Sequence, residues 1–187
     1  MPSACTVHLI LGGARSGKSR HAEQLARNAE AAGAQVVYLA TAWPGDDEMR
    51  ERIAQHREQR PAHWRTIEVP LEVDALAAAL GQHARSDSCV LVDCLTLWLS
   101  QLMCPPSGIA PGDTDAAVRA LLGILPRLQG QVLFVSNEIG WGVMPLGRET
   151  RAVVDGLGRL NQELARTADR VTLMVAGLPL AVKSPDS

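Results

Sequence analysis

Residues 12–19, with the sequence GGARSGKS, constrain the fold of this chain more than any other segment. They fit the phosphate-binding pattern G-x-x-x-x-G-K followed by Ser or Thr in full. A short apolar run at residues 6–11 precedes the pattern, and from Lys18 onward apolar residues recur at helical spacing. This strand–loop–helix context is the one that a phosphate-binding loop, or P-loop, requires, so a chance glycine turn is a poor explanation.

Each residue type in this loop has a chemical reason. The glycines let the backbone curl so that successive N–H groups point at phosphate oxygens, and the following helix adds its positive dipole end. We expect Lys18 to reach the β- and γ-phosphates, and Ser19 to supply a hydroxyl to Mg²⁺. Arg15 is either a phosphate contact or a solvated loop arginine, and the sequence leaves both open. The predicted nucleotide-binding residues of the loop are Gly12, Gly13, Ala14, Arg15, Ser16, Gly17, Lys18 and Ser19.

Strand-like and helix-like segments alternate along almost the whole chain. This order predicts an α/β fold with a mostly parallel sheet and helices on both faces, because parallel strands need crossover connections. Together with the P-loop it indicates a RecA-like P-loop NTPase in one domain, residues 1–187, with an antiparallel edge strand near the C-terminus. The expected strands are residues 6–11, 36–40, 64–69, 90–93, 132–135 and 171–175, with the edge strand at 180–182. The expected helices are residues 18–32, 46–60, 73–84, 95–102, 117–125 and 153–168, with loops at 104–113 and 137–147.

The composition narrows the class of protein. Of 187 residues, 47% are hydrophobic and only 3% aromatic, so we expect a mostly aliphatic core. The formal net charge of -2 argues against nucleic-acid binding, which needs a clear excess of Lys and Arg. The four cysteines form no C-x-x-C pair, which favours reduced thiols over a disulfide or zinc site. No apolar stretch approaches the ~20 residues of a membrane helix, and the first residues do not resemble a signal peptide, so we expect a cytoplasmic protein.

Ligands on parallel sheets bind beyond the carboxyl ends of the strands. Gly12, Thr41, Asp93 and Asn137 end or follow predicted strands, so one site is expected there. Asp93 closes the apolar run at residues 90–92. An acidic residue in this position, paired with a P-loop, is predicted to orient the hydrated Mg²⁺.

The polar segment at residues 46–60 holds a candidate nucleophile. On a helix, Glu48, Arg52 and His56 form one stripe at i, i+4 and i+8. A neutral imidazole can attack phosphorus near neutral pH, and neighbouring arginines would stabilise the anionic transition state. The alternative is a surface histidine in a helix with many ion pairs, and the spacing alone favours that alternative.

Five stretches carry a resemblance to a known family. They are GGARSGKSRHAE at residues 12–23, DDEM at 46–49, RPAHW at 60–64, SNEIGWGVMP at 136–145 and RLNQELA at 159–165. In this order they resemble the bifunctional adenosylcobinamide kinase/adenosylcobinamide-phosphate guanylyltransferase family. The resemblance runs from about Leu9 to about Lys183, which is nearly the whole chain.

The resemblance implies one enzyme with two activities. The first would phosphorylate the aminopropanol hydroxyl of adenosylcobinamide with ATP or GTP. The second would transfer GMP from GTP to adenosylcobinamide phosphate through a covalent GMP–histidine intermediate. It would release pyrophosphate and give adenosylcobinamide-GDP, in the assembly of the nucleotide loop of cobalamin. The resemblance also implies a homotrimer with its active site at a subunit boundary.

Residue by residue, the resemblance places the nucleophile on His56, which would act together with Lys18. We expect His21 to pack in the P-loop helix and His63 to lie in a turn or at the rim of the site. Beyond the P-loop, the nucleotide contacts implied by the resemblance are Thr41, Ala42, Trp43, Arg57, Glu58, Gln59, Arg60, Glu68 and Asp93.

Three other classes of P-loop protein are alternatives to this function. A single-function small-molecule kinase would use Lys18, Ser19 and Asp93 and leave His56 idle. A regulatory GTP switch would want an N-K-x-D guanine motif, and the sequence has none. A RecA-like nucleic-acid motor would need a basic binding face, which the charge balance does not suggest.

Overall fold

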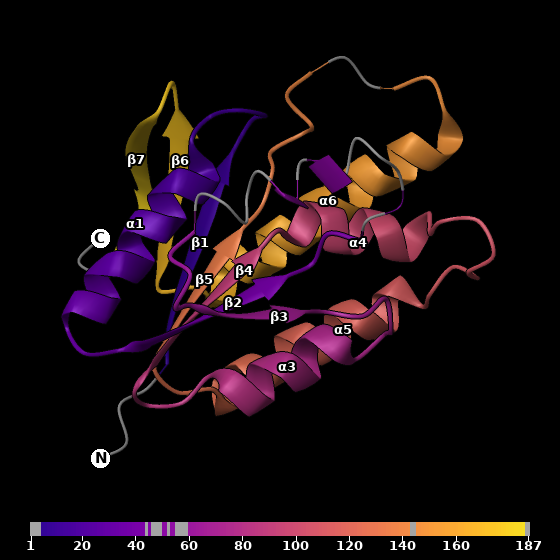
Figure 1. Cartoon of the computed structure of the whole chain (residues 1–187). Helices are drawn as coiled ribbons and strands as arrows, with labels where there is room; N and C mark the ends of the chain where they lie inside the picture. Colours follow the sequence, from indigo (N-terminus) through magenta and orange to yellow (C-terminus); the bar gives the residue numbers. More distant parts are fainter. Residues whose placement is uncertain are drawn as a thin grey trace.

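The computed structural model describes residues 5–43, 45, 50–51, 53–54, 60–142 and 145–185. In this part of the chain, seven strands form one sheet in the order β3-β2-β4-β5-β1-β6-β7 (Figure 1). Neighbouring strands are parallel except for β7, which pairs antiparallel with β6. The strands are β1 (Thr6–Gly12), β2 (Gln35–Ala40), β3 (Arg65–Glu68), β4 (Ser88–Asp93), β5 (Gln131–Val135), β6 (Arg170–Val175) and β7 (Leu178–Lys183).

Helices connect the parallel strands. Asp113 caps the start of α5, because its carboxylate accepts a hydrogen bond from the Ala116 amide at 2.9 Å. The helix α1 ends before Gly33, whose φ of 99° is readily adopted only by glycine. The described helices are α1 (Lys18–Ala31), α3 (Ala75–His83), α4 (Leu95–Met103), α5 (Thr114–Ile124), the 3₁₀ turn Leu125–Arg127 and α6 (Arg148–Thr167).

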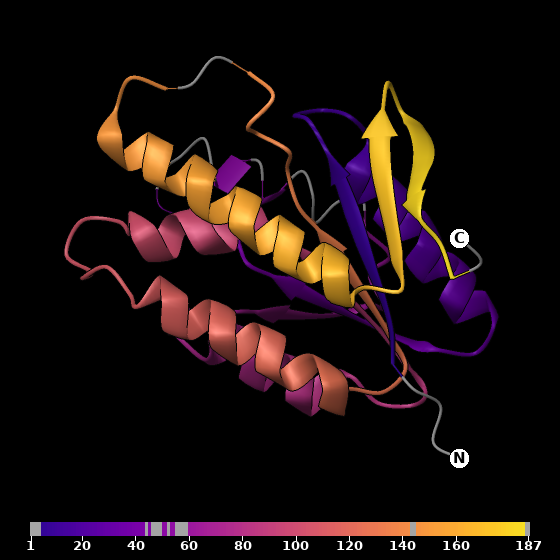
Figure 2. The same cartoon turned by 180° about the vertical axis from the view of Figure 1, so that it is seen from behind.

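The two faces of the sheet are covered unequally. Successive side chains of a strand point to opposite faces, so Val90 and Val92 of β4 lie in one apolar cluster while Cys89 and Leu91 lie in another. The first cluster packs against α3, α4, α5 and α6, and the last three lie side by side in Figure 2. The second cluster is smaller and is covered by α1 together with Trp64. The helices expected on both faces are therefore confirmed, with most of them on one side.

The predicted elements in the described part of the chain are confirmed, with differences mainly at their ends. The last long helix begins at Arg148 rather than residue 153, because its polar first turn carries no apolar period. Capping by Asp113 likewise starts α5 at Thr114, before the expected residue 117. The expected helix at 46–60 lies largely outside the described residues. No described helix is long and apolar enough to cross a membrane. All four cysteines are free thiols, as expected.

Candidate functional site

The P-loop joins β1 to α1 at the carboxyl edge of the sheet. Gly12 ends β1 with a φ of 152°, and Gly17 caps α1 with a φ of 93°. A Cβ on Gly12 would lie 2.6 Å from the Ser16 Oγ and 2.8 Å from the Met174 carbonyl oxygen. Only glycine fits there, because both the backbone angle and the space exclude a side chain. The loop is thus closed tightly on itself and against β6.

Lys18 folds back over this loop. Its side chain is buried, with 7% exposed, and the Nζ donates a hydrogen bond to the Gly13 carbonyl oxygen at 2.6 Å. Burial lowers the pKa of Lys18 below its usual range, while Cys94 and Asp93 act in the opposite direction. The ammonium therefore lies among the loop groups that can bind phosphate oxygens.

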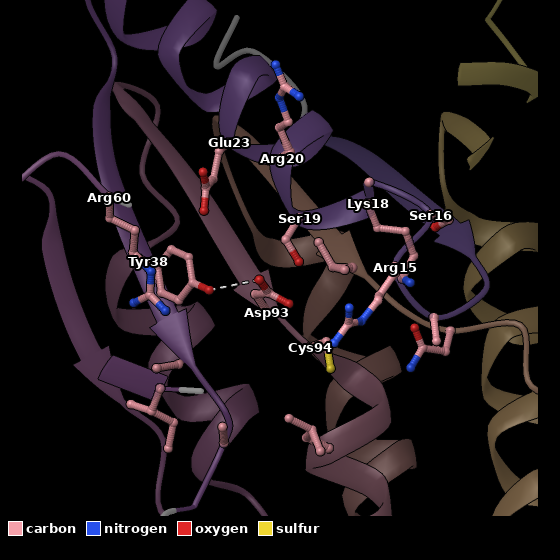
Figure 3. A pocket seen from close by; sticks show the side chains of 18 of the residues that line it. Arg15, Ser16, Lys18, Ser19, Arg20, Glu23, Tyr38, Arg60, Asp93 and Cys94 are labelled. Atoms are coloured by element: carbon pink, nitrogen blue, oxygen red, sulfur yellow. Dashed lines mark hydrogen bonds between the residues drawn. The ribbon is translucent and has the colours of Figure 1, made fainter. Parts of the chain in front are cut away.

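A cavity of about 890 Å³ opens beside the loop and is lined by the polar and charged side chains of the site (Figure 3). Its volume lies within the range of small-molecule sites. The P-loop and α1 form one wall, and the ends of β2, β4 and β5 form the floor. The polar and charged residues that line it are Arg15, Ser16, Lys18, Ser19, Arg20, Glu23, Tyr38, Arg50, Arg60, Glu68, Asp93 and Asn137.

Tyr38 links an acidic and a basic side chain of this cavity. Its hydroxyl donates a hydrogen bond to the Asp93 Oδ2 at 2.9 Å, and the Arg60 guanidinium lies 3.5 Å from its ring centroid. Burial first, and then the nearby Asp93, raise the pKa of Tyr38 well above its usual value. The Nε and Nη1 of Arg60 are buried and have no hydrogen-bond partner among the described residues. An anionic ligand would satisfy these donors, because a guanidinium binds phosphate well.

Ser19 and Asp93 are suited to hold Mg²⁺ with a bound triphosphate. In Figure 3 the Ser19 side chain points toward the Asp93 carboxylate. The described residues contain no group of three or more His, Cys, Asp or Glu side chains that could hold a metal ion alone. Magnesium sites on nucleotides typically use one or two protein oxygens and complete the shell with phosphates and water. The pair therefore fits a nucleotide-dependent Mg²⁺ site.

Most of the described residues that the sequence predicted for the site lie together. Gly12 and Gly13 shape the loop backbone. Four predicted residues, His56, Arg57, Glu58 and Gln59, lie outside the described residues. The predicted residues that line the cavity are Ala14, Arg15, Ser16, Gly17, Lys18, Ser19, Ala42, Arg60, Glu68 and Asp93.

Thr41 and Trp43 do not line this cavity. Thr41 is 2% exposed, and its hydroxyl donates to the Cys94 carbonyl oxygen at 2.8 Å, so it ties β2 to β4. Trp43 has 41% of its surface exposed, and its backbone amide donates to the Gln101 side chain at 3.2 Å. Strand-end position alone does not show which way a side chain points.

The two other candidate histidines also stand apart from the cavity lining. His63 is exposed and lies in a turn, one of its two predicted positions, and it pairs with Glu30 at 2.7 Å. His21 is half-buried on α1, and burial lowers its pKa. Neither is among the residues that line the cavity.

Sequence reasoning missed several lining residues. Tyr38, Glu23 and Arg20 were not predicted, because nothing local marks them as chemical groups. The available signals were weak: Tyr38 is the one tyrosine of the chain, and Arg20 and Glu23 are spaced three apart on the helix that follows the P-loop. The sheet order, which places β2 beside β4, brings Tyr38 to Asp93.

These features define a P-loop nucleoside-triphosphate-binding protein: a phosphate-binding loop at the end of β1, its buried lysine, and an acidic residue at the end of β4. A more particular assignment follows from sequence comparison. The family model described as cobinamide kinase/cobinamide phosphate guanyltransferase matches residues 8–182, and the chain belongs to this family.

Two relatives agree with this membership, and a solved structure agrees with the fold. The chain is 53% identical to the bifunctional adenosylcobalamin biosynthesis protein CobP of Pseudomonas aeruginosa, over 94% of this chain and 96% of that one. It is 38% identical to the protein CobU of the same description in Salmonella typhimurium, over 94% and 98% of the two chains. The flagellar accessory protein FlaH of Methanocaldococcus jannaschii has a similar fold, with a TM-score of 0.55 at 11% identity over 98% of this chain and 80% of that one.

Proposed function

We propose that this chain phosphorylates adenosylcobinamide with ATP or GTP and then transfers GMP from GTP to adenosylcobinamide phosphate. The observation that carries the proposal is the cavity in which Lys18, Asp93 and Arg60 converge next to the P-loop. These are the charges that a triphosphate and its transfer reactions require. Membership of the family indicates the acceptor substrates, because the family is described as cobinamide kinase and cobinamide phosphate guanyltransferase.

In the kinase step, the P-loop amides and Lys18 hold the β- and γ-phosphates. The acceptor hydroxyl oxygen forms a bond to the γ-phosphorus, and the bond from that phosphorus to the β–γ bridging oxygen breaks. The nucleoside diphosphate leaves and the hydroxyl proton passes to water. Mg²⁺ held by Ser19 and Asp93 would neutralise charge on the phosphate oxygens.

In the guanylyl step, a ring nitrogen of His56 bonds to the α-phosphorus of GTP and pyrophosphate leaves. A phosphate oxygen of adenosylcobinamide phosphate then attacks the same phosphorus and frees the histidine. Ile53 and Ala54 precede His56 in the sequence, Arg60 follows it, and all three line the cavity. This supports the choice of His56, because the described residues on either side of it line the same cavity as the P-loop.

Two further parts of the proposal concern the assembly and its surroundings. We infer a homotrimer, and we place the enzyme in the cytoplasm, where ATP and GTP are supplied.

Labelling with GTP that carries a radioactive α-phosphate, in the presence of Mg²⁺, tests the guanylyl step. We expect the wild-type protein to acquire an acid-labile, base-stable label, and His56→Ala to lose the label and keep measurable kinase activity. Lys18→Ala should weaken triphosphate binding and damage both activities. No label on a wild-type protein that phosphorylates adenosylcobinamide would leave a single-function kinase as the better description.

A further inference from the structure

The chain that follows β5 is fastened to the beginning of the P-loop. The Ser136 amide donates a hydrogen bond to the Ile10 carbonyl oxygen at 3.0 Å, and the Glu138 amide donates to the Gly12 carbonyl oxygen at 3.1 Å. The segment 136–138 thus continues alongside β1 after β5 has ended. Lys18 binds the next carbonyl along the loop, that of Gly13. The segment and the Lys18 ammonium therefore bind adjacent carbonyl groups of the loop.

Asn137, in the middle of this segment, is held by its backbone on both sides. Its amide donates to the Thr96 Oγ1 on α4 at 2.9 Å, and its carbonyl oxygen accepts from the Asn161 Nδ2 on α6 at 3.0 Å. The residue also lines the cavity that contains Lys18. With its backbone fixed in this way, the carboxamide is the group of Asn137 that remains for a ligand.

Asn161 is the centre of this arrangement. It is 4% exposed, and its Nδ2 donates both to the Asn137 carbonyl oxygen and to the Glu138 Oε1, the latter at 2.9 Å. Its Oδ1 accepts a hydrogen bond from the Ser136 Oγ at 2.7 Å. A buried carboxamide is stabilising only when such bonds are made.

The neighbours of Asn161 show what packing alone would favour. The other large residues on the buried side of α6 are Leu157, Leu160 and Leu164, in the aliphatic core. A fourth leucine would fill the position without hydrogen bonds. The amide instead fixes three successive residues, 136–138, next to the phosphate loop.

We propose that the Asn137 carboxamide donates a hydrogen bond to the terminal phosphate of the triphosphate on the P-loop, and that Asn161 is its positioning residue. Lys18 reaches the β- and γ-phosphates in P-loop proteins, and Asn137 lines the same cavity as Lys18. A neutral amide at this end distinguishes a triphosphate from a diphosphate, because only the triphosphate extends to it. The inference rests on the proposed function only in requiring a nucleoside triphosphate on the loop.

Calorimetric titration of Asn137→Ala tests the contact. The ligands are the non-hydrolysable β,γ-imido analogue of GTP and GDP, each with Mg²⁺. We expect the Kd of the triphosphate analogue to rise about 10- to 100-fold, as for one hydrogen bond to a charged group, and that of GDP to change less than about threefold. Equal weakening of both ligands, or no change in either, would overturn the contact.

Asn161→Leu tests the positioning role, with Gln162→Leu on the exposed side of α6 as its matched control. The first variant should lose discrimination between the analogue and GDP in the same direction as Asn137→Ala, and the control should keep the wild-type ratio. Thr96→Val removes the acceptor of the Asn137 amide at nearly constant side-chain volume. If Asn161→Leu does not fold, this variant tests whether a fixed Asn137 backbone is needed for discrimination between the two ligands. If Thr96→Val and Asn161→Leu both fold and keep the wild-type ratio between the Kd values of the analogue and of GDP, Asn161 does not position Asn137.

The two proposals fail in different ways. If the wild-type protein binds triphosphate but neither acquires label nor phosphorylates adenosylcobinamide, the proposed function is wrong and the Asn137 contact can still hold. If the wild-type protein performs both reactions while Asn137→Ala keeps its preference for triphosphate, the Asn137 contact is wrong and the proposed function stands.

Discussion

At the scale of single residues, the side chains of the site support one another through short chains of contacts. Arg60 rests on the Tyr38 ring, and Tyr38 binds the Asp93 carboxylate. A change at Tyr38 therefore acts on both a basic and an acidic group. Groups that hold a metal-binding carboxylate commonly tune metal affinity without touching the metal.

Tyr38→Phe tests this coupling. Phenylalanine keeps the ring beneath Arg60 and removes the hydroxyl that orients Asp93, so we expect the Mg²⁺ concentration for half-maximal kinase activity to rise about tenfold. Tyr38→Leu removes the ring as well and should also weaken triphosphate binding. Kinase assays at varied Mg²⁺ and nucleotide separate the two effects. If Tyr38→Phe responds to Mg²⁺ like the wild-type protein, the hydrogen bond to Asp93 has no such role.

His8 gives a pH dependence to stability. It is buried in β1, where its Nε2 lies 2.8 Å from the Thr172 Oγ1, and burial, with His21 and Arg170 nearby, lowers its pKa to about 4. The unfolded chain binds a proton near pH 6.5, whereas the folded chain does so only near pH 4. Stability is therefore complete above pH 6.5 and is lost as the pH falls toward 4.

Urea unfolding at pH 7 and pH 5 measures this effect. From the two pKa values, the free energy of unfolding should fall by about 2 kcal/mol between these pH values through His8 alone. His8→Gln keeps a hydrogen-bonding partner for Thr172 and does not titrate, so it should show a smaller fall. An equal fall in both proteins would assign the acid sensitivity to other groups.

At the scale of elements, the β1–loop–α1 unit depends on the different demands of two adjacent glycines. Gly12 has a φ of 152° and no space for a Cβ, whereas no atom lies within 4 Å of the position of a Cβ on Gly13. The first glycine is required by the fold of the loop. The second is not required for steric reasons.

The matched variants Gly12→Ala and Gly13→Ala test this difference by thermal unfolding. Gly12→Ala should lower the free energy of unfolding by about 2 kcal/mol or more, because the Cβ would overlap backbone and side-chain atoms in a strained conformation. Gly13→Ala should stay within about 0.5 kcal/mol of the wild type. The same loss in both variants would contradict the steric argument.

The sequence predicted these elements well because their signals are local. Apolar alternation and helical spacing marked the strands and helices, and the P-loop pattern placed β1 and α1. The hydrogen-bond partners of Asp93 and Asn137 could not be predicted in the same way. Tyr38 and Asn161 lie 55 and 24 residues from their bonded partners Asp93 and Asn137. Such contacts depend on the order of strands in the sheet, and no periodicity encodes that order.

At the scale of the whole molecule, the antiparallel edge is unusual for its apolar surface. The large apolar side chains of β7, Leu178, Leu180 and Val182, are all exposed. Exposed apolar residues that repeat along an edge strand favour association with another chain. This surface is a candidate for a contact between subunits.

Light scattering on the purified protein tests the homotrimer, which should have about three times the 20.0 kDa of one chain. The double substitution Leu180→Lys and Val182→Lys should shift the mass toward one chain, because charged side chains oppose burial of the edge. Circular dichroism checks that the variant is folded. A monomeric wild type would contradict the trimer, and a trimeric variant would exclude this edge from the interface.

The unequal cover of the sheet has a consequence for how such a protein can change over generations. The side chains of β4 that pack under four helices are interleaved, residue by residue, with those that face the layer of α1. Both sets are buried and apolar, so substitutions among them act on stability, whereas the residues that line the cavity lie mainly at the strand ends, in the P-loop and on α1. A lineage can therefore acquire new substrates through substitutions at the strand ends, provided that the volume of the two buried layers stays nearly constant.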